Sequence, residues 1–423
     1  MQNIMRDANY PYPTLIKWHR IRLNCFTQTK MTLFKQLSRL SFFLLTLVNL
    51  TAMTLPQTAF AEISHCQANW PEWEQFKQTF ITSDGRVIDH SGSIKPTVSE
   101  GQAYAMFFAL AANDRNSFQR LLTWTENNLA GGDLTVRLPA WQWGQKPDTS
   151  WGVIDSNSAS DADLWIAYSL SIAGEVWKEK RYSALASLIA QRILNEETAN
   201  LPGLGLTLLP APAGFHLPDN SWKLNPSYVP LQLLRWFART EKDERWKKLI
   251  ASSLKMILGA SPKGYTADWI LYQSEKGFLP DVQGAEKGNG SYNAIRVYLW
   301  AGMLHEREPE RSGLLNQLQA MRKLTESQGY PPESVNIQTG EAMNAASSGF
   351  SAALLPFLRA SKADSALQQQ NLRVQAQGIK PDSYYDQVLA LFGLGWQNQR
   401  YRFDPNGKAS FQWQQTCQGI ATP

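Results

Sequence analysis

The chain has 423 residues, of which 43% are hydrophobic, 11% aromatic and 18% charged. This composition can bury a large core, so it excludes an intrinsically disordered chain, a collagen-like repeat and a disulfide-stapled miniprotein. The formal net charge of +5 arises at the N-terminal end, where residues 1–61 hold seven Lys and Arg against one acid. The remaining chain has 34 basic and 35 acidic residues. It therefore offers no basic field to a nucleic acid and favours an uncharged substrate.

Residues 31–61 have the pattern of a secretory signal. Lys35 and Arg39 precede the apolar run LSFFLLTLVNL at 40–50, and AFA at 59–61 forms an A-x-A cleavage site. The apolar run has 11 residues, whereas a membrane-spanning helix needs about 20. We expect cleavage after this tripeptide, no membrane insertion afterwards, and a periplasmic or secreted location. An uncleaved membrane anchor is the alternative.

The rest of the chain is expected to be one domain. Residues 1–30 are interpreted as an upstream extension from an early start codon, and residues 62–423 as the mature domain. Cys66 and Cys417 lie near its two ends. In an exported protein these cysteines fit a disulfide worth a few kcal/mol, and two free buried thiols are the alternative. The five scattered histidines and these cysteines have no metal-ligand spacing, so we expect no metal and no cofactor.

Apolar residues recur at helical spacing, between loops rich in Gly, Pro, Asn and Asp, and no long alternating β pattern occurs. Twelve helices, or six pairs, are predicted near 71–81, 99–112, 115–129, 159–176, 180–195, 227–239, 243–258, 291–304, 311–326, 347–358, 362–373 and 383–396. The segment 103–112 is apolar on nearly every face, whereas 243–258 has one polar face. Alternation of this kind predicts an all-α architecture, with an inner ring of buried helices inside an outer ring.

The predicted loops contain many aromatic residues beside Asn, Asp and Gly. Sugar rings present apolar CH faces that stack on flat aromatic rings, so an exported chain with an uncharged substrate favours a carbohydrate-binding cleft at these loops. Each ring could instead anchor a loop or fill the core. The residues concerned are Trp141, Trp143, Trp151, Trp222, Tyr292 and Tyr330.

Three polar clusters open helices of the buried type. In the first, TVSEGQ at 97–102, Ser99 and Gln102 have the spacing of a capping box, which places Glu100 at a helix start. Acidic residues are common there because they complement the helix dipole. A wholly apolar helix follows, however. We therefore expect the Glu100 carboxyl to face an interior or a cleft, where it could serve as a general acid.

The second cluster, DSNSASDAD at 155–163, holds Asp161 and Asp163, which cannot share one helix face. It is not an EF-hand calcium loop, because the required Gly and the final Glu are missing. The third cluster, GSYNAIR at 290–296, places Asn293 and Arg296 on one helix face at i, i+3. A capped helix with a buried arginine would have the same pattern.

The segments SEGQAYAMFF, ASDADLWIAYSLSIAGEVW, NPSYVP and SYNAIRVYLW, in this order and spacing, resemble glycoside hydrolase family 8. The likeness covers nearly all of 66–417 and is greatest to the periplasmic cellulases encoded with bacterial cellulose synthase. It implies an (α/α)6 barrel, consistent with the six helix pairs. It also implies endo-acting, inverting hydrolysis of β-1,4-glucosidic bonds. A cellulose chain and the cellulose synthase machinery are then the expected partners.

The resemblance also implies roles for individual residues. The proton donor of the family falls on Glu100, and its second conserved acid falls on Asp161, which we expect to hold a distorted sugar. The tyrosine and arginine that position the attacking water fall on Tyr228 and Arg296. Four further substrate-binding residues are expected in the loops: Trp141, Trp151, Asn157 and Tyr292.

Position 293 departs from the family pattern, in which SYDA supplies an aspartate as the general base. An amide cannot accept a proton at neutral pH, and losing a general base costs about 10²–10⁴-fold in rate. Another carboxylate, Asp161 or Asp281, could take the role. The chain could also be a weakened hydrolase that still binds glucan, or carry an Asp→Asn change that traps substrate. Two other hypotheses are a same-fold hydrolase of another β-glycan and a helical scaffold for protein partners.

Overall fold

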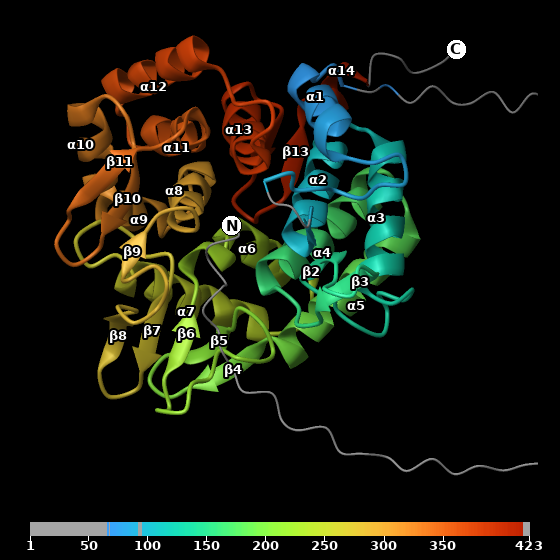
Figure 1. Ribbon diagram of the computed structural model, residues 1–423, viewed down its shortest axis with the longest axis horizontal. Helices are drawn as coiled ribbons and strands as arrows, with labels where there is room; N and C mark the ends of the chain where they lie inside the picture. The colour runs from blue at the N-terminus through green and yellow to red at the C-terminus, as the bar shows by residue number, and fades with distance from the viewer. Residues whose placement is uncertain (1–65, 67, 92–94, 418–423) are drawn as a thin grey trace, which may run out of the picture. The chain divides into compact units, whose positions relative to one another are not determined.

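The computed structural model describes residues 66, 68–91 and 95–417. Its inner ring consists of α2 (Ser99–Ala111), α4 (Ser160–Val176), α6 (Leu231–Thr240), α8 (Ala294–Met303), α11 (Ser348–Ala360) and α13 (Tyr384–Gln397). The outer helices are α1 (Pro71–Phe80), α3 (Arg115–Leu129), α5 (Lys180–Glu196), α7 (Arg245–Gly259), α9 (Arg311–Gln317), α10 (Gln319–Gln328) and α12 (Asp364–Gln377). The predicted all-α (α/α)6 barrel is confirmed (Figure 1).

The two rings differ in burial as their sequences do. Every residue of α2 and of α8 is buried, as expected for helices without a polar face. The outer helix α7 instead buries one stripe, which includes Trp246, Leu249 and Met256. Hydrophobic burial therefore decides which member of each helix pair lies inside.

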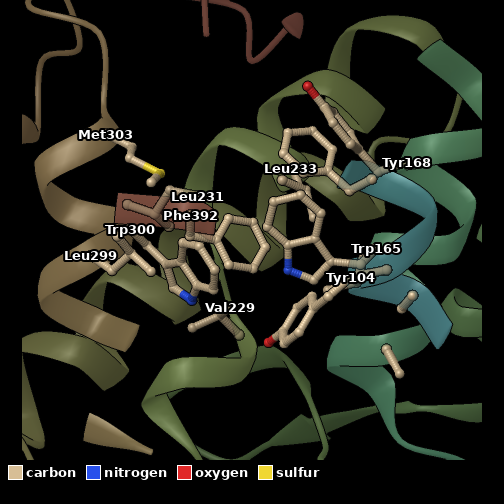
Figure 2. Packing of buried hydrophobic residues seen from close by; sticks show 14 of the residues in the cluster. Tyr104, Trp165, Tyr168, Val229, Leu231, Leu233, Leu299, Trp300, Met303 and Phe392 are labelled. Atoms are coloured by element: carbon tan, nitrogen blue, oxygen red, sulfur yellow. The ribbon is translucent and has the colours of Figure 1, made fainter. Parts of the chain in front are cut away.

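Aromatic side chains from four inner helices meet at the centre of the barrel (Figure 2). The ring centroids of Tyr104 and Phe392 are 5.0 Å apart, and those of Trp165 and Trp300 are 5.4 Å apart. Trp300 also contacts Phe392, at 5.0 Å. Tyr104 lies one helical turn after Glu100, so this cluster supports the helix end that carries the candidate acid.

Short strands connect the helices, and the sequence did not predict them because runs of two to five residues are too short to show alternation. They form three three-stranded sheets, β1-β2-β3, β6-β7-β8 and β11-β10-β9, and the hairpins β4-β5 and β12-β13. Their bounds are β1 Thr97–Val98, β2 Gln142–Gln145, β3 Trp151–Asp155, β4 Thr198–Leu201, β5 Gly205–Leu208, β6 Trp222–Leu224, β7 Ile270–Gln273, β8 Gly277–Pro280, β9 Asn289–Gly290, β10 Pro332–Asn336, β11 Ala342–Ala345, β12 Tyr401–Phe403 and β13 Ala409–Phe411. A short helix, α14 (Gln412–Thr416), follows the last strand.

The predicted capping box at the start of α2 is wrong. The N-cap position is Val98, which makes no side-chain cap. Gln102 instead turns away from the helix end: its Oε1 accepts the N–H of Val87 at 2.6 Å, and its Nε2 donates to the Gly85 carbonyl at 3.1 Å. Gln102 therefore stabilises the buried loop before α2. Glu100 lies in the first turn of the helix, as expected.

Two other helix predictions need correction. The segment predicted as 227–239 begins with a 3₁₀ turn, η1 (Pro226–Tyr228), and α6 starts only at Leu231, because Pro230 disfavours helical geometry in the residue before it. The helix predicted at 311–326 is divided into α9 and α10 at Leu318.

A disulfide joins Cys66 to Cys417 across a sequence separation of 351, which confirms the predicted pairing. The predicted signal and upstream extension, by contrast, lie outside the described residues. Among the described helices, none has the length and apolar character that would let it cross a membrane.

Candidate active site

Arg296, on the first turn of α8, is the centre of the site although it is only 1% exposed. Its Nη2 donates to Asn293 Oδ1 at 2.9 Å and to Ser227 Oγ at 3.0 Å. Its Nη1 donates to the Tyr385 hydroxyl at 3.2 Å. The guanidinium therefore joins α8, the η1 turn and α13.

The two acids suggested by the sequence face the same guanidinium. Glu100 Oε2 lies 3.4 Å from Arg296 Nη1, and Asp161 Oδ2 lies 3.8 Å from Nη2. Glu100 comes from the start of α2 and Asp161 from the start of α4, and both are buried. The fold thus brings together residues that stand almost 200 positions apart in the chain.

The surroundings of Asp161 favour its protonated form. Burial raises its pKa well above the ordinary value, the negative charge of Glu100 raises it further, and Arg296 only partly opposes these effects. The two carboxyls lie close enough to interact directly, which favours one proton shared between them. An inverting pair of carboxyls must instead lie about 6.5–9.5 Å apart to admit a water molecule. The contact between Asp161 and Glu100 therefore argues against Asp161 as a replacement base.

Asn293 presents the wrong chemistry for a base. A guanidinium can only donate, so the amide atom that contacts Arg296 must be the acceptor Oδ1. The other end of the amide therefore presents Nδ2, which can only donate hydrogen bonds. A water molecule there would receive a hydrogen bond and could not lose a proton to Asn293.

Tyr228 ends the NPSY segment, whose other residues build the turn. Asn225 Oδ1 accepts the N–H of Ser227 at 3.0 Å and its hydroxyl at 2.7 Å, and Ser227 Oγ in turn accepts from Arg296. Burial, together with the charges of Asp161 and Glu100, raises the pKa of Tyr228 well above its ordinary value. The phenol therefore remains a neutral hydrogen-bonding group near both acids.

Three residues of this site were missed by the sequence analysis: Ser227, Asp268 and Tyr385. Tyr385 accepts from Arg296 and donates to the carbonyl oxygen of Tyr292. Asp268 Oδ1 accepts the backbone N–H of Asn293 at 3.0 Å. A tyrosine pair at a helix start and a lone acid between Ala267 and Trp269 were the only sequence signals.

Tyr292 points toward the hairpin of β10 and β11. Its hydroxyl donates to Glu333 Oε1 at 2.7 Å, and Glu333 Oε2 accepts from Asn344 Nδ2 at 3.1 Å. Its ring packs edge-on against Phe350 at 5.3 Å. Tyr292, the residue before Asn293, is therefore held by contacts with β10 and α11.

Trp141 and Asn157 lie beside the start of α2. The Trp141 carbonyl accepts the N–H of Ser99 at 2.9 Å, and its own N–H donates to the Asn157 carbonyl at 2.7 Å. The half-buried Trp141 indole makes no ring contact or hydrogen bond within the described ranges. Asn157 Nδ2 instead donates to the Ala213 carbonyl at 2.9 Å and holds a loop.

Trp151 belongs to a separate cluster on the β2-β3 hairpin. It is 49% exposed and stacks on Trp143, with ring centroids 5.4 Å apart. The Arg86 guanidinium lies 4.5 Å from the Trp143 ring and 4.9 Å from the Trp151 ring. Because Trp143 pairs with Thr97 in the β1-β2 ladder, this cluster sits at the approach to Glu100 and makes no contact with Arg296.

Asp281, the other suggested base, has different partners. Its Oδ2 lies 2.9 Å from Lys223 Nζ, and its Oδ1 accepts the N–H of Gly284 at 3.0 Å. Neither contact brings it to Arg296. No group of three or more metal-ligating side chains occurs in residues 66, 68–91 and 95–417.

A second buried carboxyl pair lies two residues beyond Asp161. Burial raises the pKa of Glu197 to about 8 and that of Asp163 well above its ordinary value, and the nearby Glu197 carboxyl raises the pKa of Asp163 further. Ser158 Oγ donates to Glu197 Oε1 at 2.5 Å. This pair ties the end of α5 to the segment that carries Asp161.

Known proteins resemble this chain over most of its length. The family model described as "Glycosyl hydrolases family 8" matches residues 48–399. A protein named endoglucanase from Escherichia coli O157:H7 is 46% identical over 359 residues, covering 85% of this chain and 95% of that one. An endoglucanase from Xanthomonas axonopodis pv. citri is 41% identical over 367 residues, covering 86% and 94%.

Solved structures agree with these relatives. The endo-1,4-D-glucanase of Vibrio fischeri ES114 has a TM-score of 0.78 and 45% identity, covering 81% of this chain and 99% of its own. The endo-β-1,4-glucanase CMCax of Acetobacter xylinum has a TM-score of 0.66 and 26% identity, covering 78% and 98%.

Proposed function

The chain belongs to glycosyl hydrolase family 8, and on that premise we propose that it is an endoglucanase that cuts β-1,4-glucan chains internally. The observation that carries this function is the convergence of Glu100, Asp161 and Tyr228 around Arg296. Relatives that match almost their whole length are named endoglucanases, which supports the substrate class.

In the proposed reaction, Glu100 passes the proton that it shares with Asp161 to the glycosidic oxygen as the bond breaks. The contact with Arg296 holds the Glu100 carboxyl in place and offsets the negative charge that is left on the pair. Asp161, then ionised, would hold a hydroxyl of the distorted sugar. Trp141, whose half-buried indole stacks on no other ring in the described chain, would stack on a neighbouring sugar ring.

The attacking water would lie between Tyr228, Arg296 and Asn293. Tyr228 and Arg296 can orient it, but no side chain of this trio can take its proton, because Asn293 is an amide and arginine does not deprotonate. We therefore propose that hydrolysis is attenuated while glucan binding is retained. A glucan-binding protein without useful turnover is the second candidate function, and Asn293 is the observation that favours it.

The test is the release of reducing ends from carboxymethyl-cellulose by the full chain, Glu100→Gln and Asn293→Asp. We expect a slow parent, an inactive Glu100→Gln, and an Asn293→Asp faster by about 10²–10⁴-fold, because the aspartate restores a general base. A parent as fast as Asn293→Asp would show that another group supplies the base. Hydrolysis of a different β-glycan, with cellulose left intact by all three, would overturn the substrate.

The cellular setting is part of the same proposal. The signal pattern at 31–61 supports export, removal of residues 1–61 and a single mature domain of 62–423. The likeness to cellulases of cellulose synthase operons supports a role in trimming nascent cellulose beside the synthase. N-terminal sequencing of the exported protein tests the first point. Cellulose yield in a strain lacking the gene tests the second.

A further inference from the structure

Asp268 lies just before β7 and is wholly buried. Its Oδ1 accepts three backbone N–H groups, from Ser291 at 2.8 Å, Asn293 at 3.0 Å and Ala294 at 2.6 Å. Its own N–H donates to the Asn289 carbonyl at 2.9 Å. A single carboxylate oxygen therefore fixes the backbone of the turn that leads into α8.

That turn carries Asn293 and leads to Arg296, two of the three residues around the proposed position of the attacking water. Asn293 occupies the N-cap position of α8, but its side chain does not cap the helix, because its Oδ1 accepts from Arg296. The first N–H groups of a helix have no partner within the helix. Asp268 supplies that partner from another segment of the chain, which leaves Asn293 free to face Arg296.

The residues on either side of Asp268 connect its segment to the turn before Asn293 and to Tyr228. A Cβ on Gly290 would lie 1.8 Å from the Thr266 carbonyl oxygen, so segment 266–268 and the turn are in direct contact. On the other side, the Trp269 ring lies 6.0 Å from Tyr228. A shift of this segment would therefore displace Tyr228 and Asn293 relative to each other.

We propose that Asp268 is a positioning residue for the attacking-water site, which sets the backbone from which Asn293 and Arg296 project toward Glu100. It does not touch substrate, and it acts through the turn at 291–294. This inference rests on the proposed hydrolase function.

The chain contains a matched control for a purely structural role. Asp114 also caps a helix, accepting the N–H of Ser117 at 3.0 Å, and it is likewise buried, with hydrogen bonds from Trp73 Nε1 and Lys77 Nζ. It stands beyond the far end of α2, about 20 Å along the helix from Glu100. Loss of Asp114 should affect stability and leave the site unchanged.

The experiment measures kcat, KM and melting temperature for Asp268→Ala, Asp268→Asn and Asp114→Ala, in the full chain and in its Asn293→Asp form. We expect Asp268→Ala to lower kcat about 100-fold with KM within about twofold, because a misplaced water site slows chemistry without removing sugar contacts. Asp268→Asn keeps an acceptor at Oδ1 and should stay within about threefold of its parent. Asp114→Ala should keep its kcat.

Should Asp268→Ala fail to fold, Asp268→Glu takes its place, since it keeps the charge and displaces the turn by one methylene. We then expect at least a tenfold loss of kcat. A normal kcat in folded Asp268→Ala or Asp268→Glu, or losses that follow melting temperature equally in Asp114→Ala, would overturn this proposal alone. If neither the parent nor Asn293→Asp cuts cellulose, the proposed function fails and this inference fails with it.

Discussion

Arg296 contacts two carboxyls, an amide and two hydroxyls while it is almost completely removed from water. The cost of removing a charge from water is high, so a buried guanidinium needs partners. Both terminal nitrogens of Arg296 have them, and only its Nε has none among the described residues. Its planar fork fits several acceptors at once, which an ammonium group cannot do. Each acceptor around Arg296 therefore contributes both to stability and to the alignment of Glu100.

Tyr384 and Tyr385 are neighbours in the chain, and substituting each in turn tests whether the contact with Arg296 affects catalysis. Tyr385 hydrogen-bonds with Arg296 and with the Tyr292 carbonyl, whereas the buried Tyr384 hydroxyl has no hydrogen-bond partner in the described chain. We expect Tyr385→Phe to lower kcat about tenfold and stability by about 1 kcal/mol. Tyr384→Phe should leave kcat unchanged and keep or raise the melting temperature. Equal effects of the two variants on kcat would contradict this role of Tyr385.

Trp151 is expected to extend the glucan-binding surface. Its exposed ring is already fixed by Trp143 and Arg86, so binding a sugar would cost little ordering. Trp151→Ala should weaken binding of long cello-oligosaccharides about 3- to 10-fold, the equivalent of about 0.5–1.5 kcal/mol for one aromatic contact. Short oligosaccharides should bind as before. Affinity electrophoresis in a Glu100→Gln background measures this without turnover.

The control for Trp151 is Leu372→Ala, which removes an equally exposed apolar side chain from the outer helix α12. It should leave affinity for every chain length unchanged. A Trp151→Ala variant that loses affinity for short and long chains alike would instead place this residue among the central sugar contacts.

At the scale of single elements, Gly101 sets how closely α2 approaches α13. A Cβ at this position would lie 2.7 Å from the Tyr384 hydroxyl oxygen. Gly101→Ala should therefore cost about 1–3 kcal/mol, as overpacking in a filled core does. Adding Tyr384→Phe removes the clashing oxygen, so the double variant should recover most of this loss. Urea unfolding of both variants measures the difference, and additive losses would refute the clash.

The carboxyl pair of Asp163 and Glu197 predicts how stability varies with pH. Burial raises the pKa of Glu197 to about 8 in the folded chain, above its ordinary value of 4.5. The folded state therefore binds a proton that the unfolded state has released. Stability from this group is complete below about pH 4.5 and is lost as the pH rises toward 8.

Glu197→Gln should flatten this pH dependence, because an amide cannot ionise. We expect its melting temperature to fall less between pH 5 and 8 than that of the parent chain. Glu326→Gln is the control, since Glu326 lies on α10, pairs with Arg322 and is not among the charges that raise either pKa. If both variants keep the slope of the parent, the buried pair is not its cause.

Part of the fold and of the candidate site could be predicted from the sequence, and part could not. Ten of the twelve predicted helices correspond to single helices of the structure, because buried and amphipathic periodicity are visible locally. Glu100, Asp161, Tyr228 and Arg296 were found through family motifs, and the barrel brings them together. Ser227, Asp268 and Tyr385 were missed, since their roles depend on contacts between distant segments. Trp151 was predicted in the cleft, and nothing local in the hairpin sequence revealed its separate cluster with Arg86.

For the whole molecule, the Cys66–Cys417 disulfide connects the segment before α1 to the end of α14. Closing so long a loop restricts the unfolded chain much more than the folded one. We expect Cys66→Ser/Cys417→Ser to lose about 2–4 kcal/mol of stability, with kcat unchanged because neither residue contacts the site. Thermal unfolding with and without a reductant measures this. A reductant should lower the melting temperature of the parent and leave that of the double variant unchanged.

The Cα atoms of Cys66 and Cys417 are only 5.7 Å apart, so two distant points of the chain are spatial neighbours. A linker of one or two residues could span this gap, since successive Cα atoms are about 3.8 Å apart. The protein could then be circularly permuted, with new ends placed at the turn between α11 and α12 around Lys362. Such a rearranged chain would begin and end on the outside of the barrel and still bring Glu100 to Arg296, because the ring of helices has no obligatory starting point.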